Sequence, residues 1–71
     1  MNTAIFFADG FEEIEGLTVV DMFRRAGISI QTVSISDSLT VTGSHDIKVQ
    51  ADCLLADFDF KLYHLVAVSS A

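Results

Sequence analysis

The side chain with the clearest chemical potential is Glu15, near the start of a predicted helix. On a projection of about 100° per residue, Glu15 falls between Met22 and Ala26 on an otherwise apolar arc. A carboxyl group on that arc would face the sheet, and loss of water would favour its protonated form, which can donate a hydrogen bond. The alternative is that the Glu15 side chain extends into solvent at the start of the helix.

Three other reactive side chains, Cys53, His45 and His64, give weaker signals. Asp52 and Asp57 lie near Cys53, and since negative charge disfavours a thiolate, we expect an unreactive, structural cysteine. The spacings of His45, His64 and Cys53 match no metal motif, so we expect no metal ion. The chain has no glycine motif of the dinucleotide-binding or phosphate-binding kind, so we expect no cofactor.

Charge and length exclude several classes of protein. The 71 residues form at most one small domain. Four basic and ten acidic side chains give a formal net charge of −6, which argues against binding nucleic acid or an anionic membrane surface. The first residues lack the basic region of a signal peptide, and no apolar stretch approaches the roughly 20 residues that span a bilayer. We therefore expect a cytoplasmic protein, with Asp52, Asp57 and Asp59 on a solvated surface.

The mean hydropathy of +0.48 is high for so short a chain. Small domains expose much of their surface and usually have polar compositions. Below about 70–80 residues, a single core rarely stabilises a fold by more than roughly 3–5 kcal/mol without a disulfide or a metal. Either the apolar surface is buried against another chain, or these residues are part of a larger domain.

The amino-terminal segment predicts a strand followed by a helix. The apolar run over residues 3–8 is typical of a strand that is buried on both faces. The next segment predicts a helix over residues 11–27, with Asp9 as its N-cap and Glu12 completing a capping box. Gly27 is expected to end this helix.

The rest of the chain predicts further strands. Residues 28–35 alternate apolar and polar side chains, as a half-buried strand does. Residues 39–42 and 46–49 flank a glycine-containing turn and predict a β-hairpin. Residues 51–60 are irregular, and residues 62–68 predict a last strand.

This order of elements is strand, helix, strand, β-hairpin and strand, which predicts an incomplete doubly wound α/β sheet. We expect residues 1–71 to form the amino-terminal part of a single domain. The helix should cover one face of the sheet, and no later segment of this sequence is expected to cover the other.

Two apolar residues of the helix, Ile14 and Leu17, fall on its charged arc. Asp21 and Arg25 lie beside them and form an i,i+4 pair. Exposed apolar residues in this setting indicate a partner surface. The alternative is ordinary scattered surface hydrophobes, which are at least as common.

Three segments, FFADGFEEIEGLTVVDMFRRAGI, TVSIS and VTGSHDIKVQAD, resemble the amino-terminal third of the ThiJ/PfpI superfamily. The branch most similar to them is that of the Parkinson-associated deglycase and its bacterial relatives, and the resemblance covers residues 4–68. It implies a flavodoxin-like domain of roughly 180–200 residues in full. It also implies a homodimer with Ile14 at an interface position, and a small carbonyl substrate with glyoxalase-like or deglycase-like chemistry or a role in oxidative stress.

The resemblance further implies a reactive cysteine beyond residue 71. In the family, the Glu that matches Glu15 hydrogen-bonds the sulfur of that cysteine, and a protonated carboxyl group there can stabilise a thiolate or a sulfinate. Cys53 does not match the reactive position. The resemblance therefore implies that this chain alone is catalytically inactive.

The sequence departs from the family pattern at three places. Val19 stands where close relatives usually carry Pro, which should leave the helix straighter. Asp46 stands where bacterial relatives often have Gly, which puts the hairpin geometry in question. The segment 69–71 stands where the family has Pro-Gly-Gly, so we expect a truncated or fragmentary member.

Three functional hypotheses remain open. The chain contributes Glu15 and the helix to a cysteine site completed elsewhere. Or it is an assembly module, in which Ile14, Leu17 and an uncovered sheet face pair with a second copy or with a complementing chain. Or it is a truncation that does not fold stably alone.

Overall fold

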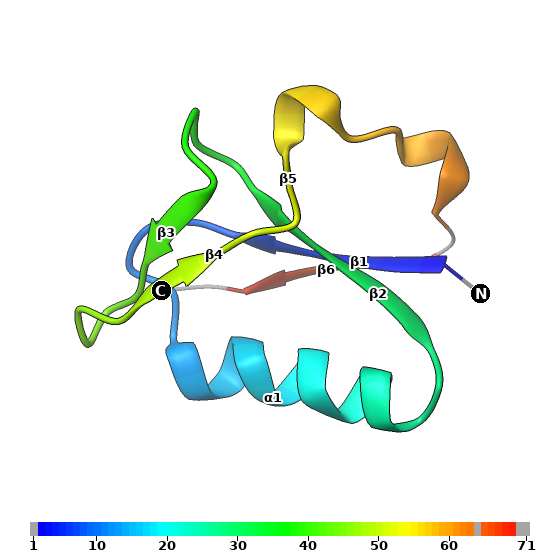
Figure 1. Ribbon diagram of the computed structural model, residues 1–71, viewed down its shortest axis with the longest axis horizontal. Coiled ribbons are helices and arrows are strands. Elements are labelled where there is room, and N and C mark those ends of the chain that lie inside the picture. Colours follow the sequence, from blue (N-terminus) through cyan, green and yellow to red (C-terminus); the bar gives the residue numbers. More distant parts are fainter. Residues whose placement is uncertain (1, 64, 70–71) are drawn as a thin grey trace.

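A computed structural model describes residues 2–63 and 65–69, the last five by their backbone. It contains a four-stranded parallel sheet, a separate antiparallel hairpin and one α-helix (Figure 1). The elements are β1 (Asn2–Phe7), α1 (Glu13–Arg25), β2 (Ser29–Ser34), β3 (Thr40–Thr42), β4 (Lys48–Gln50), β5 (Cys53–Leu54) and β6 (Leu65–Ser69), with 3-10 turns at Leu55–Asp57 and Phe60–Leu62. This order confirms the predicted α/β class and the hairpin.

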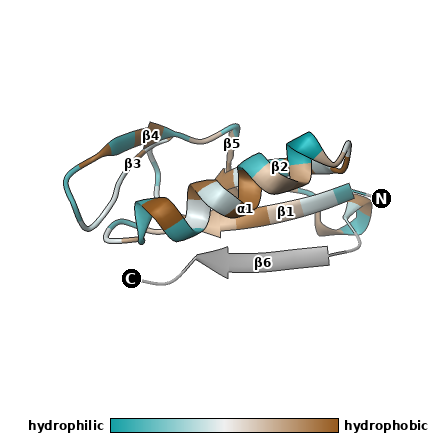
Figure 2. Ribbon diagram, turned by 90° about the horizontal axis from the view of Figure 1, so that it is seen from below, coloured by the Kyte–Doolittle hydropathy of each residue, from teal (hydrophilic) through white to brown (hydrophobic). Residues whose placement is uncertain are grey.

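The sheet has the strand order β5-β2-β1-β6. Strand β1 lies between two parallel neighbours, with Thr3 opposite Ile30 on one side and Leu65 on the other. A crossover through α1 joins the parallel strands β1 and β2, as in doubly wound proteins. Strand β6 forms one outer edge of this sheet, whereas α1 lies over β1 and β2 (Figure 2).

The core lies between α1, the sheet and the hairpin. Phe7 and Phe11 are fully buried and stack with ring centroids 4.5 Å apart. The other buried members of this cluster come from every neighbouring element: Ile5, Val20, Ile30 and Val41. Val19 packs against the same cluster within an uninterrupted helix, so the absence of Pro leaves α1 intact.

The predicted start of the helix was wrong. Helix α1 begins at Glu13, with Glu12 as an N-cap whose side chain makes no capping hydrogen bond. The Asp9 carboxylate accepts a hydrogen bond from the backbone N–H of Thr42 at 3.0 Å, so it binds the hairpin and not the helix. The capping-box pattern predicts a hydrogen bond to a backbone N–H group of the adjoining helix turn. Here the carboxylate accepts from a backbone N–H group 33 residues away instead.

The predicted orientation of the helix was correct only in part, since Val19, Val20 and Phe23 of the apolar arc face the core. The residues of α1 that are buried are Glu13, Gly16 and Val20, whereas Glu15 is exposed and Met22 is 61% exposed. The buried arc is therefore rotated away from Glu15. The apolar pattern does not reveal this rotation, because Gly16 and Glu13 also face inward. Neither a glycine nor a carboxylate contributes to an apolar arc.

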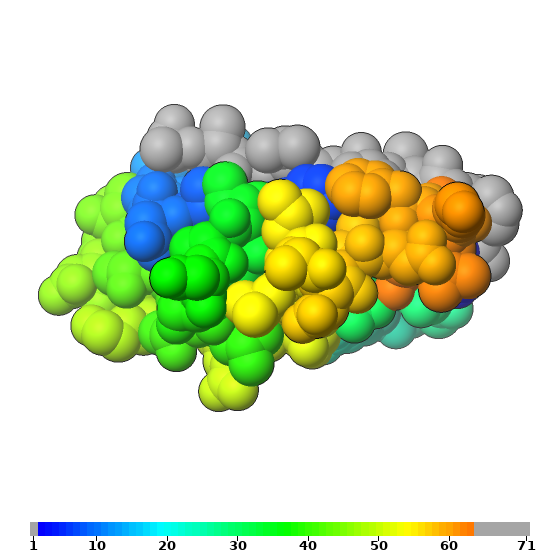
Figure 3. All heavy atoms as spheres, turned by 90° about the horizontal axis from the view of Figure 1, so that it is seen from above, coloured from blue at the N-terminus to red at the C-terminus, as the bar shows by residue number. Residues whose placement is uncertain are grey.

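The second face of the sheet is partly covered, contrary to expectation. Phe6 points away from α1, since it alternates with Ile5 and Phe7, and it packs edge-to-face against Phe58 and Phe60 at 5.2 and 5.8 Å. The space-filling view from this side shows the segment 53–63 over the centre and the right of the face, and not over its left part (Figure 3). The covering segment is itself open on its outer side, where Phe60 is 56% exposed.

Asp52, Asp57 and Asp59 are exposed, which confirms the expected solvated acidic surface. The Asp52 carboxylate also accepts hydrogen bonds from the Thr32 backbone N–H at 3.0 Å and from Arg24 at 3.1 Å. It thereby joins the end of α1 to the strand pair β2 and β5. Among the described residues, no helix combines the length and the apolar character needed to cross a membrane.

Candidate functional site

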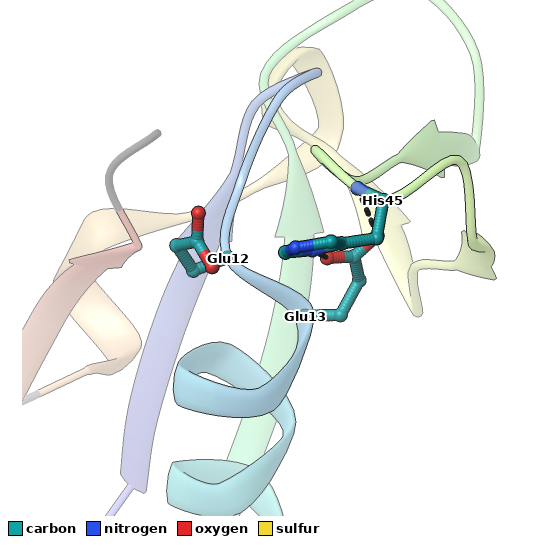
Figure 4. A group of neighbouring side chains, drawn as sticks. All are labelled: Glu12, Glu13 and His45. Atoms are coloured by element: carbon teal, nitrogen blue, oxygen red, sulfur yellow. Dashed lines mark hydrogen bonds and ion pairs between the residues drawn. The ribbon is translucent and has the colours of Figure 1, made fainter.

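The polar side chains of interest gather where α1 begins, beyond the carboxyl end of β1. The hairpin turn 43–47 lies against this point and brings His45 to Glu13, with Glu12 close by (Figure 4). Ligand sites of doubly wound proteins lie at the carboxyl ends of their strands. The position is therefore one where this fold can place a functional group.

Glu13 is the central residue of this cluster and is only 3% exposed. Its Oε2 accepts hydrogen bonds from the backbone N–H groups of His45, at 2.8 Å, and Ile47, at 3.3 Å. Its Oε1 accepts from His45 Nδ1 at 2.8 Å. We call this carboxylate and its donors on the hairpin turn the Glu13 latch.

The hairpin turn is shaped to receive the carboxylate. A β-carbon on Gly43 would overlap with the Glu13 side chain, so any larger residue would displace it. Asp46 adopts the left-handed conformation, with φ of 64°, which Asp tolerates better than most residues. The replacement of Gly by Asp at this position is thus compatible with the turn.

The hydrogen bonds of the Glu13 latch shift the pKa values of both Glu13 and His45. Burial alone would raise the pKa of Glu13, but hydrogen bonds from the His45 side chain and from the backbone of Glu13, His45 and Ile47 outweigh burial and lower this pKa to about 2. The hydrogen bond to Glu13 and the negative charges of Glu13 and Glu12 raise the pKa of His45 above its usual 6.5. Glu13 is therefore ionised at every ordinary pH.

The same cluster contains the atoms of a possible cation site. Ligand atoms of Glu12, Glu13 and His45 lie within 4.8 Å of one another. However, both Glu13 oxygens already accept hydrogen bonds, and Glu12 accepts one from Ser44 Oγ at 3.1 Å. A cation would have to displace these bonds, so the arrangement fits a structural latch better than a metal centre.

The residues predicted to act lie around this latch but are not part of it. Glu15 lies two residues after Glu13, about 200° further round the helix, and is exposed. Ile14 is 81% exposed and Leu17 38%. The expectation that Glu15 is desolvated against the sheet was therefore wrong within this chain.

The remaining predicted positions lie apart from the latch. Asp21 and Arg25 form an ion pair at 2.9 Å on the exposed surface of α1. Cys53 is a half-buried free cysteine, and burial together with Asp52 and Asp57 raises the pKa of its thiol, in keeping with the expected low reactivity. His64 lies outside the described residues.

Sequence reasoning missed the pairing of Glu13 with His45. Helical projection placed Glu13 on the charged arc, and 32 residues separate it from His45. One signal was available, namely the Gly43-Ser44-His45 turn, in which a glycine and free backbone donors offer a place for an anion. Nothing in the sequence linked that turn to a particular carboxylate.

Fold and site together define a class of protein: a parallel α/β sheet of the doubly wound type whose first helix carries acidic residues at the carboxyl end of β1. The model of the DJ-1/PfpI family matches residues 1–69. The chain belongs to the DJ-1/PfpI family, in agreement with the resemblance of its motifs.

Individual relatives give the same result. Protein DJ-1 homolog B of Arabidopsis thaliana is 33% identical over 61 residues, which are 86% of this chain and 14% of that protein. A cysteine-to-alanine mutant of the DJ-1 superfamily protein STM1931 from Salmonella typhimurium is 31% identical, with a TM-score of 0.92. Oxidized DJ-1 of Toxoplasma gondii is 28% identical, also with a TM-score of 0.92.

The matches cover nearly all of this chain but only part of each relative. Both solved structures match 99% of this chain, which corresponds to 38% of their own chains. The chain thus spans well under half of the solved relatives and a still smaller share of the plant protein.

Proposed function

We propose that this chain contributes Glu15 to a cysteine-dependent site that acts on small carbonyl compounds in the cytoplasm. Residues outside the present sequence supply the cysteine. The carboxyl group of Glu15 donates a hydrogen bond to the sulfur and so stabilises the thiolate. By itself the 71-residue chain is inactive, because it lacks this nucleophile.

One observation carries the proposal: Glu15 is exposed in the first turn of α1, beyond the carboxyl end of β1. Because Glu15 is exposed, its carboxylate has no role in the packing of the described sheet. Its flank of the helix is open to a further part of the fold, and relatives contain more than half of their chains outside the matched region.

A chimera tests the proposal. The present 71 residues are joined to the part of the Salmonella STM1931 protein that follows the matched region, with its cysteine retained. Methylglyoxal consumption is then measured for the chimera, for Glu15→Ala and for Glu12→Ala. We expect Glu15→Ala to lower kcat/KM by about 100-fold, as the loss of one preorganised donor does, and Glu12→Ala to change it less than about 3-fold.

Two results would contradict the proposal. One is equal activity of the chimera and its Glu15→Ala variant. The other is turnover by the 71-residue chain alone above that of its Glu15→Ala variant, since such turnover would need no added cysteine.

A second candidate function is assembly, and the exposure of Ile14 favours it. An isoleucine that is 81% exposed on a helix beside Leu17 is suited to contact with another chain. The partner would be a second copy of this chain or a complementing chain that extends the sheet at β6. Here the helix is a binding surface and no chemistry is required.

A further inference from the structure

We propose that Glu13 is a positioning residue, which fixes the first turn of α1 against the β3–β4 hairpin and thereby sets the direction of Glu15. This inference rests on the proposed role of Glu15. Glu13 itself touches no reacting group in the proposal; it acts through the helix that carries both residues.

The start of α1 has no ordinary cap. The N-cap residue, Glu12, makes no capping hydrogen bond with its side chain, so the helix end is not fixed locally. Glu13 replaces the cap with a long-range attachment, since its carboxylate accepts from His45 N, His45 Nδ1 and Ile47 N. The position of the first turn therefore depends on the hairpin.

Backbone hydrogen bonds continue this attachment along the loop that leads into α1. Gly10 N–H donates to the Thr42 carbonyl at 2.8 Å, and Ser44 N–H donates to the Phe11 carbonyl at 2.9 Å. The loop 8–12 is thus held against the hairpin on its way to the helix. Glu13 is the last of these ties and the only one of them that is formed by a residue of α1.

The geometry of the helix links the position of Glu13 to the direction of the Glu15 side chain. Glu13 and Glu15 lie on one turn, about 200° apart, so a turn held on the hairpin side presents Glu15 on the opposite side. A misplacement of about 1 Å at a reacting centre can cost roughly 100-fold in rate. Loss of the latch would leave Glu15 chemically intact and shift its carboxyl group.

The latch can be disrupted from either side. Glu13→Gln removes the charge but keeps the shape and one acceptor oxygen. Gly43→Ala leaves Glu13 unchanged and fills the space that its carboxylate occupies. Asp21→Asn is the matched control, because Asp21 lies on the same helix and its carboxylate pairs with Arg25 on the exposed surface, apart from the hairpin turn.

The first measurement reads position directly and requires no activity. Residual dipolar couplings of the Ile14, Glu15 and Gly16 amides are recorded for the chain, or for the chimera, with and without each substitution. We expect Glu13→Gln and Gly43→Ala to change these couplings while those of β1 stay constant, and Asp21→Asn to leave both sets unchanged. Unchanged couplings in both latch variants would overturn the proposal, whether or not the chimera is active.

The second measurement is a double-mutant cycle in the chimera. We expect Glu13→Gln to lower kcat about 10-fold or more in the presence of Glu15 and to have no further effect after Glu15→Ala. Additive losses would overturn the positioning role, because a general loss of stability would act equally in both backgrounds. A chimera without Glu15-dependent turnover would instead reject the proposed function, and the couplings would still decide on the latch.

Discussion

Glu13 combines near-complete burial with a permanent negative charge, and the hairpin makes this possible. An isolated buried carboxylate would become protonated, but three hydrogen-bond donors on the turn hold Glu13 in its ionised form. His45, which is largely exposed, completes the site as a charged or neutral donor. At the scale of the residue, therefore, the stability of this corner should depend on pH.

The latch should be strongest at mildly acidic pH. Glu13 has a folded pKa of about 2 against 4.5 unfolded, so its contribution is present above pH 4.5 and is lost as pH falls toward 2. His45 has a pKa raised above 6.5, so its contribution is present below 6.5 and is lost as pH rises through the raised value. Both contributions are therefore complete only between pH 4.5 and 6.5.

Thermal unfolding of the chain and of its Glu13→Gln variant checks this window. The difference in Tm between them should be largest between pH 4.5 and 6.5 and should shrink at lower and at higher pH. A difference that stays constant from about pH 3 to about pH 8 would contradict the latch as a charge-dependent device.

At the scale of elements, long-range hydrogen bonds set the positions that local patterns leave open. The apolar run of β1, the alternation of β2 and the glycine turn of the hairpin all predicted their elements. Each of these signals lies within a few consecutive residues, as apolar periodicity and turn chemistry do. The rotation of α1 was not predictable in this way. It depends on Gly16 and Glu13 facing inward, and the partners of Glu13 lie 32 residues away.

The same limit applies to the second sheet face. Residues 51–60 carry no clear period, so the packing of Phe58 and Phe60 on Phe6 could not be read from their order. The role of Asp52 was missed for a similar reason, since an acidic residue in an irregular segment is usually solvated. Only the fold shows that it meets Arg24 and the Thr32 backbone.

Asp52→Ala should loosen α1 from the strands. The Thr32 N–H loses its partner, and because this site is part-buried we expect a loss of about 1 kcal/mol in the free energy of unfolding. Asp21→Ala is the matched control, since it breaks an exposed ion pair with Arg25 and should cost less than about 0.5 kcal/mol. Urea unfolding of both variants measures the difference, and equal losses would argue against the role assigned to Asp52.

At the scale of the molecule, the distribution of apolar surface agrees with the high mean hydropathy. Ile14, Met22, Phe60 and Leu62 are all more than half exposed, at 81%, 61%, 56% and 59%. Strand β6 leaves one edge of the sheet without a neighbour among the described strands. These features suit a chain whose apolar surface meets another part of a domain or another molecule.

Oligomeric state tests the part of this surface that lies on α1. If Ile14 pairs two copies, sedimentation of the chain should give a dimer and Ile14→Glu should give a monomer. Ile35→Glu is the control, because Ile35 is 48% exposed but follows β2, away from α1. A chain that is monomeric at all concentrations, or a dimer that Ile14→Glu does not affect, would reject this interface.

In the proposed function, Glu15 acts on the sulfur of a cysteine that lies outside the present sequence. The most direct test is the rate of iodoacetamide alkylation of that cysteine in the chimera, with Cys53→Ser as the background so that a single thiol is observed. If Glu15 stabilises the thiolate, Glu15→Ala should slow alkylation at neutral pH several-fold, and Glu12→Ala should not. Identical rates for the parent, Glu15→Ala and Glu12→Ala would contradict this role of Glu15.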